Sequence, residues 1–291
     1  MAASMGHQNH FGYSASGAPT LEWELTAFTP RLNEDLYAAD GMRGTRGSQS
    51  ERVVQNTRAP GFSMTMQPNA VELDTLLPLI LGAAEIVDVF ALAETLPTFT
   101  FSVDLGGTAR WYWVSCYVDK ATFSAQQGGP LELTMEVESL TFTTDATVFP
   151  TLVTSAIGPY IYSESSAGLS VSSTAYGFFS WQLAIDNMLV KDRFTNSQTR
   201  TALPSAGRSV TWTWDGPYGD TTALFGLAAA GVLSSATFTK GTRSTLFAST
   251  GVSYPREFPQ VNGKAEIHLP LVGQARRVTT TQELIVTNDS V

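Results

Sequence analysis

The sequence predicts a mainly β fold built from two tandem repeats, each with one short helix. Three observations support this fold class. Alternating segments are separated by turn residues about every 8–12 residues, a spacing typical of sandwiches and barrels. One strand–turn–helix pattern occurs twice within the 291 residues. Hydrophobic residues make up 43% of the chain, enough for a packed core, so we expect two sandwich-like or barrel-like domains.

The first strand–turn–helix pattern occupies residues 61–82. Its apolar residues alternate up to a turn at Pro68 and then form an apolar run, as expected for a half-buried strand followed by a helix. Residues 208–231 repeat the pattern, with the turn at residues 215–217. The alternating apolar residues are Phe62, Met64 and Met66 in the first copy and Val210, Trp212 and Trp214 in the second.

The elements around this pattern also recur in the same order. A strand led by tryptophan comes first, at residues 22–28 and again at 180–186, and an arginine-bearing stretch follows it. After the helix, two strands meet near a glycine, and a threonine-rich strand closes the repeat. The matching positions are Trp23 and Trp181, Phe123 and Phe258, Gly129 and Gly263, and then Leu131, Leu133, Met135 and Val137 with Ala265, Ile267, Leu269 and Leu271. This ordered agreement favours a duplicated domain over chance similarity.

The repeats divide the chain into four parts. We expect a flexible N-terminal arm at residues 1–19 and the first domain at 20–150. A linker rich in Gly, Ser and Pro follows at 151–175, and the second domain occupies 176–291.

Composition limits the classes of function. Charged residues make up 15% of the chain, below a typical value of about 25%, which favours self-assembly over a bland monomeric surface. A net charge of −9 argues against binding duplex DNA by neutralising its phosphates. The single cysteine, Cys116, allows neither an intrachain disulfide nor a thiolate metal cluster. The N-terminus lacks a signal-peptide pattern, and no apolar run approaches the roughly 20 residues that span a bilayer. We expect a soluble protein that folds in the cytosol without membrane contact.

No residue pattern supports an enzyme, a cofactor site or a metal site. His7 and His10 lie in the expected arm, and His268 lies on a strand without a second His or Cys at ligand spacing. The glycine-rich segment 41–47 lacks the Lys-Ser/Thr pair of a phosphate-binding loop. We find no Ser-His-Asp arrangement, and we expect no catalytic residues.

Two clusters leave alternatives open. Glu132, Glu136 and Glu138 share one face of a strand, because strand side chains repeat every two residues. Paired carboxylates can act in acid–base chemistry or hold a metal, but the second copy retains only Glu266, which favours a solvated or interface face. Four aromatic residues suit core and interface packing, with sugar stacking as the alternative. These are Trp111, Tyr112, Trp113 and Tyr117.

Taken together, these features resemble the major tail tube protein of long, non-contractile (siphovirus-like) phage tails, in the subgroup with a duplicated domain. The resemblance rests on the Trp-led or Phe-led first strand, the long arginine-bearing loop and the strand–turn–helix. It also rests on the hairpin that turns at a glycine and on the closing threonine-rich strand. It covers about residues 20–150 and 176–288.

The resemblance implies an assembly. Each domain would be a β-sandwich with a flanking helix, and its hairpins would join those of neighbouring domains around a lumen. Six domains complete a ring in that family, so three doubled chains would form a pseudo-hexameric ring. Stacked rings would form the tail tube, the conduit for genome ejection.

The resemblance also implies partners. They are further copies of the chain, the tape measure protein, the tail terminator and the tail tip proteins. Double-stranded DNA would pass without tight binding, and the protein would reside in the virion tail after assembly in the host cytoplasm. The alternatives are a tail terminator, a connector or a tail-tip ring protein and, from another class, a carbohydrate-binding β module.

Two sets of residues are predicted to serve this function. The acidic hairpin residues Glu132, Glu136 and Glu266 are expected to face the channel, because an acidic lumen repels DNA and lets it slide. The arginine-bearing loop at residues 41–58 is expected to be mobile in the free protein and ordered on ring stacking. Its candidate inter-ring residues are Arg43, Arg46, Arg52 and Arg58.

Overall fold

Strands dominate the structure, which confirms the predicted mainly β fold class. One α-helix, α1 (Ala70–Leu81), lies among the described residues, and no helix there is long and apolar enough to cross a bilayer. The helix predicted for the second repeat falls within residues 219–230, outside the described residues. The computed structural model describes residues 9–15, 19–38, 53–106, 110–145, 152–165, 169–218, 231–255, 258–259, 261, 266–278 and 281–291.

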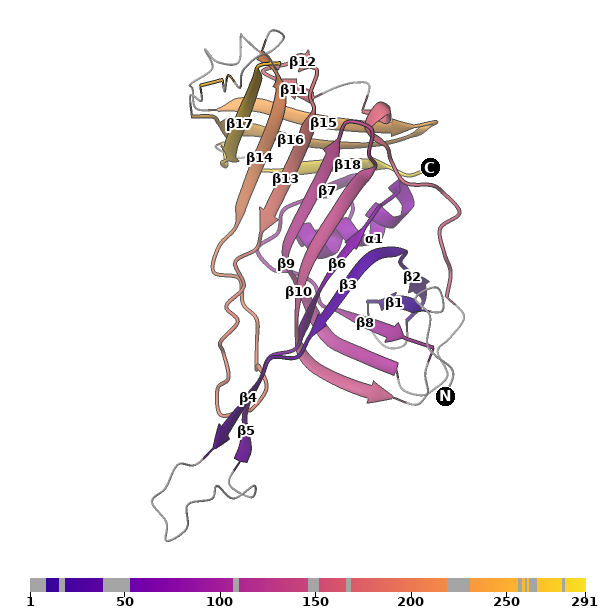
Figure 1. The fold of residues 1–291 in the computed structure, drawn as a ribbon, viewed down its shortest axis with the longest axis vertical. Coiled ribbons are helices and arrows are strands. Elements are labelled where there is room, and N and C mark those ends of the chain that lie inside the picture. The colour runs from indigo at the N-terminus through magenta and orange to yellow at the C-terminus, as the bar shows by residue number, and fades with distance from the viewer. Residues whose placement is uncertain are drawn as a thin grey trace.

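Within these residues, sixteen strands form one sheet, which curves along the length of the molecule (Figure 1). The pairings along its main path are antiparallel. In spatial order, the main path is β12 (Thr174–Tyr176), β11 (Leu169–Val171), β15 (Val232–Lys240), β16 (Arg243–Ser253), β17 (His268–Ala275), β14 (Ser209–Pro217), β13 (Ser180–Asp186), β9 (Arg110–Gln126), β10 (Leu131–Asp145), β6 (Gly61–Met66) and β3 (Leu25–Arg31).

The remaining elements flank this path. β8 pairs with β9 and β1, β18 pairs with β16 and β7, and β4 and β5 form a separate two-stranded arm. Their bounds are β1 (His10–Ser14), β2 (Leu21–Glu22), β4 (Glu34–Ala38), β5 (Val53–Arg58), β7 (Val89–Ala91), β8 (Phe99–Asp104), β18 (Ile285–Asp289) and a 3₁₀ turn, η3 (Tyr162–Glu164).

The two halves of the chain have the same spatial order of strands. In the first half the order is β8-β9-β10-β6-β3, and β1 pairs with the outer side of β8. In the second half the order is β15-β16-β17-β14-β13, and β11 pairs with the outer side of β15. The short strands β2 and β12 extend β1 and β11 in turn. Each half therefore contains the same arrangement of five strands and an outer hairpin.

These outer hairpins come from segments that the sequence assigns to the arm and the linker. Residues 10–14, within the expected flexible arm, form β1, and Tyr13 on this strand is buried. Residues 169–176, within the expected linker, form β11 and β12. Trp23 does not lead β3 but precedes it and stacks on Tyr13, with ring centroids 4.7 Å apart. The first tryptophan therefore packs on the outer hairpin.

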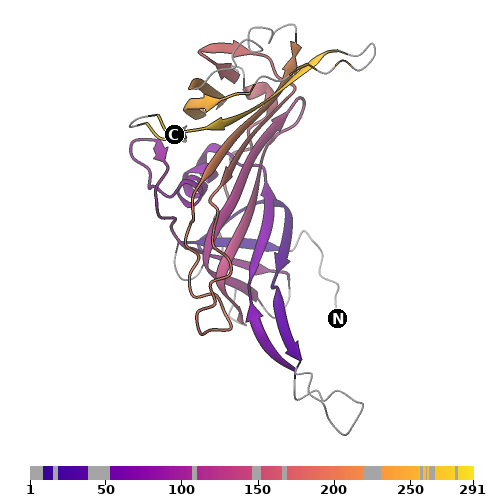
Figure 2. The same ribbon diagram turned by 90° about the vertical axis from the view of Figure 1, so that its left-hand side faces the viewer.

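The long strand β9 joins the two halves (Figures 1 and 2). Its first part pairs with β8, whereas its last part, Lys120–Gln126, pairs with Ser180–Asp186 of β13. Between these parts, the register of β9 against β10 shifts at Glu136 and Val137, which leaves Asp119 as an extra residue. A bulge bends a strand and increases its twist. The bulge thus lies where the neighbour of β9 changes from β8 of the first half to β13 of the second.

Local sequence signals set both ends of α1. The side chain of Asn69 accepts hydrogen bonds from the backbone N–H groups of Val71 and Glu72, and the Glu72 carboxylate accepts one from the Asn69 N–H. This capping box satisfies donors that a helix start leaves open. Burial raises the pKa of Glu72 to about 7, and the Asn69 hydrogen bond opposes that shift. Gly82, with φ 99°, ends the helix in the left-handed conformation.

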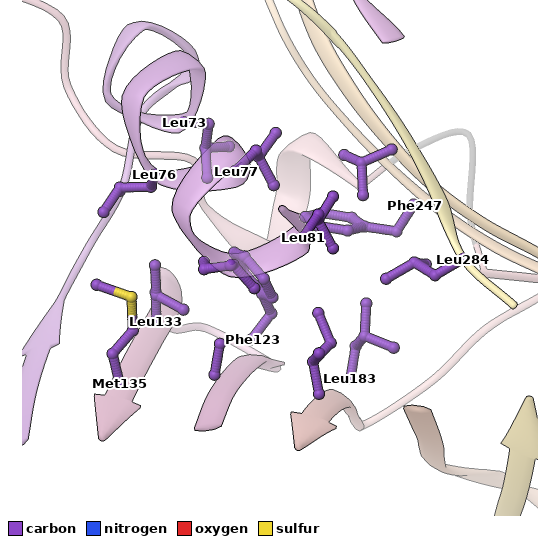
Figure 3. Packing of buried hydrophobic residues seen from close by; sticks show 14 of the residues in the cluster. Leu73, Leu76, Leu77, Leu81, Phe123, Leu133, Met135, Leu183, Phe247 and Leu284 are labelled. Carbon is purple, nitrogen blue, oxygen red and sulfur yellow. The ribbon is translucent and has the colours of Figure 1, made fainter. Parts of the chain in front are cut away.

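The buried face of α1 packs against both halves. Figure 3 shows leucines of the helix close to buried residues from the first half and the second. Buried hydrophobic residues of both halves form one cluster, so the halves share a core. The labelled members are Leu73, Leu76, Leu77 and Leu81 on α1, Phe123, Leu133 and Met135 from the first half, and Leu183, Phe247 and Leu284 from the second.

Candidate assembly surfaces

One face of the main sheet is polar. Because strand side chains alternate, residues that point toward the core are buried and their neighbours point to the opposite side. Hydroxyl, amide and acidic side chains predominate on that opposite side. We define the polar face as Ser63, Thr65, Lys120, Thr122, Ser124, Glu132, Thr134, Glu136, Gln182, Asp186, Thr211, Thr213 and Asp215.

The polar face has an excess of negative charge. It carries four carboxylates, those of Glu132, Glu136, Asp186 and Asp215, against one lysine. That lysine, Lys120, lies opposite Glu136 on β10 and Asp186 on β13, and its Nζ is 3.9 Å from an Asp186 carboxylate oxygen. Glu132 and Glu136 therefore share a solvent-accessible, acidic sheet surface.

The second half extends this face near the start of β17. Glu266 is exposed and lies two residues before His268, the first residue of β17. His268 Nδ1 is 2.8 Å from an Asp215 carboxylate oxygen, and its ring stacks on Phe179 with centroids 4.5 Å apart. Among the described residues, no three His, Cys, Asp or Glu side chains form a metal-binding group.

Glu138 behaves differently from the other two glutamates of its strand. Its side chain is only 2% exposed because three cations cover it. Arg200 Nη1 donates to Glu138 Oε2 at 2.7 Å, Lys191 Nζ lies 3.1 Å from Oε1, and Arg31 also contacts Oε1. Sequence analysis missed this cluster because its members lie far apart in the chain. Lys191 and Arg200 belong to residues 187–206 of the second half, so their ion pairs with Glu138 connect this segment to β10 of the first half.

The bulged residue Asp119 anchors the same segment. Its backbone carbonyl accepts the Asn187 N–H at 2.7 Å, and its side chain accepts the Leu189 N–H at 3.1 Å. Its carboxylate also lies 2.5 Å from Lys191 Nζ. Burial alone lowers the pKa of Lys191, but the hydrogen bonds to Asp119 and Glu138 outweigh it and raise the pKa overall. The bulge therefore supports the connection between the halves.

The β4–β5 arm projects from the body of the molecule (Figures 1 and 2). Arg58, one of the four predicted inter-ring residues, pairs with Glu34 at 3.0 Å and lies over the Phe142 ring at 5.5 Å. Arg43, Arg46 and Arg52 lie outside the described residues. The arm also exposes four apolar side chains, Leu36, Tyr37, Val53 and Val54.

A groove runs beside β3, which ends the main path of the sheet. We call it the edge groove. It comprises a hollow of about 460 Å³ along β3 and an adjoining hollow of about 260 Å³, and Pro30 and Trp111 border both. Trp113 is buried in the core and also lines the smaller hollow, so both tryptophans pack against the core and border the groove. The other residues of the groove are mainly apolar: Asn9, Phe11, Leu25, Thr26, Ala27, Phe28, Arg31, Leu32, Leu105 and Phe142.

A long curved sheet with an acidic face, an apolar groove at its edge and a projecting arm defines a structural β protein with surfaces suited to assembly. Comparison with known families agrees. The family model described as phage tail tube protein matches residues 4–275, and the chain belongs to that family. It is thus a structural component of a phage tail, as the sequence resemblance implies. No curated protein matches the chain.

Proposed function

We propose that three copies of this chain close into a pseudo-hexameric ring, and that stacked rings form the tail tube through which the genome leaves. The observation that carries this proposal is the repeated strand order. Each chain contains two five-strand modules with the same arrangement. Each module would occupy one of the six positions in a ring, so one chain would supply two of them. We interpret the two modules as products of duplication.

The junction inside the chain provides a template for the junction between chains. There, the last part of β9 from the first module pairs with β13, the edge strand of the second. The strand that corresponds to β13 in the first module is β3, and it ends the main path. The strand that corresponds to β9 in the second module is β16, which ends at Ser253, and the chain that follows includes the described residue Phe258. Repeating the junction would bring that segment of one chain to β3 of the next.

This contact is head-to-tail, because different surfaces of the two chains meet. Contacts of this kind close into rings when the rotation at each junction fits, and otherwise form open filaments. An exposed sheet edge also invites uncontrolled pairing unless it is covered. Ring closure would cover β3 of every chain, so this edge would be protected from uncontrolled pairing in the assembled ring.

In this ring the polar face would line the lumen, because the core and α1 occupy the other side of the sheet. Double-stranded DNA binds proteins mainly through phosphate contacts with Lys and Arg, and repeated contacts along a tube would hold the genome. A surface with four carboxylates and one lysine disfavours such contacts. We therefore assign Glu132, Glu136 and Glu266 to the channel wall.

The projecting arm would serve ring stacking. Its exposed Leu36, Tyr37, Val53 and Val54 offer apolar area to a neighbouring ring. Arg43, Arg46, Arg52 and Arg58 would supply the cations for its acidic surface. The tape measure, terminator and tip proteins would then contact the tube at its lumen and ends, and assembly would take place in the host cytoplasm.

Reversing the three channel glutamates to lysine should make the tube retain DNA. We expect tubes of the Glu132→Lys, Glu136→Lys, Glu266→Lys variant to bind short duplex DNA with an affinity that falls steeply with salt, as each added phosphate contact contributes a slope of about −0.9 in log K against log salt. Phage carrying this variant should eject DNA slowly and incompletely. Fluorescence anisotropy and ejection assays measure the two effects.

Two control variants separate lumen charge from other effects. Glu85→Lys changes an exposed residue after α1, off the polar face, and should leave DNA binding unchanged. Replacing the three glutamates with glutamine removes charge without adding cations and should produce only a small effect. Normal ejection and no DNA binding by assembled tubes of the triple lysine variant would contradict the lumen assignment.

A further inference from the structure

We propose that the edge groove is a socket for Phe258 of a second copy of the chain, so that one aromatic side chain fastens each junction of the ring. This inference rests on the proposed ring and names the residues that hold it together. Phe258 is 75% exposed, and the groove beside β3 is lined by aromatic and aliphatic side chains.

The template is Phe123, the residue that the sequence repeat matches with Phe258. Phe123 lies on the part of β9 that crosses to the second module, where it is opposite Leu183 of β13. It is fully buried there, and its ring centroid is 4.8 Å from that of Phe247 in the second module. Thus the first module already inserts a phenylalanine into the core of its neighbour.

Backbone register locates the corresponding position on β3. The register of β8 against β9 shifts just after the pair Phe99–Cys116, and that of β15 against β16 shifts just after the pair Val232–Val252, so Cys116 and Val252 are corresponding positions. Cys116 pairs with Ser139 of β10, and Val252 pairs with Ala275 of β17, so Ser139 corresponds to Ala275.

Counting back two residues from each of these positions reaches Val137 and Gly273, which pair with Phe62 of β6 and Trp212 of β14. Phe62 pairs with Pro30 of β3, and Trp212 pairs with Leu183 of β13, so Pro30 corresponds to Leu183.

Since Phe123 lies opposite Leu183, Phe258 of the next copy should lie opposite Pro30. Pro30 borders both hollows of the edge groove, together with Trp111. Two independent findings therefore converge on one place: the register of the duplicated strands, and an apolar hollow at the surface. The same relation matches Val261 with Gln126, an exposed residue outside the core, so Val261 would not enter the groove.

The test compares Phe258→Lys with Val261→Lys in the full-length protein. We expect Phe258→Lys to raise the concentration needed for ring or tube formation at least about tenfold, because a cation would have to enter a mainly apolar groove that already holds Arg31 at every junction. Val261→Lys should assemble like the wild type. Sedimentation and negative-stain microscopy measure assembly, and circular dichroism of the unassembled variants checks that both fold.

Cysteine crosslinking tests the pairing directly. Pro30→Cys combined with Phe258→Cys should give disulfide-linked chains on oxidation of assembled protein, because opposed strand residues lie within disulfide range. Pro30→Cys with Val261→Cys is the matched control, and the native Cys116 is buried. Tubes that form with no Pro30–Phe258 crosslink and with unimpaired Phe258→Lys would overturn the socket but not the tube. Wild-type protein that forms neither rings nor tubes would overturn both.

Discussion

Replacing Glu138 with alanine is expected to lower the free energy of unfolding by about 3–5 kcal/mol, the cost of removing one partner from a buried ion pair. The carboxylate is 2% exposed and is shared by Arg31, Lys191 and Arg200. Arg200 is the critical partner, because its own side chain is 5% exposed and cannot reach water when the carboxylate is removed. The loss leaves a buried cation without a counter-charge, and urea unfolding measures it.

Glu136→Ala is the matched control for this variant. It removes the same functional group two residues earlier on β10, where the side chain lies on the solvent-accessible polar face beside Lys120. Surface substitutions of this kind usually change stability by less than about 0.5 kcal/mol. Equal stability losses in the two variants would contradict the account of Glu138 as a buried anchor between the halves.

Replacing Asn187 with alanine should cost about 2–4 kcal/mol, because it leaves several buried polar groups without partners. The side chain is fully buried, and its Nδ2 donates to the carbonyls of Ile80 at 3.1 Å and Val118 at 3.0 Å. Its Oδ1 accepts a hydrogen bond from Arg208 Nε at 2.9 Å. Ile80 belongs to the last turn of α1, so Asn187 of the second half satisfies a helix-end carbonyl of the first.

Asn56→Ala provides the comparison for Asn187. Asn56 lies exposed on the β4–β5 arm and donates to Asp35 at 2.7 Å. Its replacement should leave the urea midpoint nearly unchanged, whereas Asn187→Ala should lower it clearly. If both variants unfold at the wild-type midpoint, the hydrogen bonds of Asn187 do not connect the halves as we describe.

Much of the fold could be predicted from local pattern. Alternation identifies the strands, and the Pro68–Asn69 turn followed by Glu72 marks the start of α1. The placement of Glu132 and Glu136 on one face also follows from alternation alone, because no bulge interrupts β10 between them.

Other features depend on contacts that no local pattern contains. Alternation assigns Glu138 to the same face as Glu136, but its cations come from residues 31, 191 and 200, so its burial could not be read from the strand. The bulge at Asp119 lies where β9 exchanges β8 for β13 as its neighbour, so it depends on the pairing of segments that are distant in the sequence. The similar motifs around Trp23 and Trp181 suggest matching positions, whereas the backbone register matches Trp181 with Phe28.

The measurement that tests the central claim most directly is cryo-electron microscopy of tubes assembled from the purified chain. We predict rings of three chains, in which the junction between chains superimposes on the junction between β9 and β13 within each chain. Rings of six chains would contradict this account, as would rings in which first modules contact only first modules.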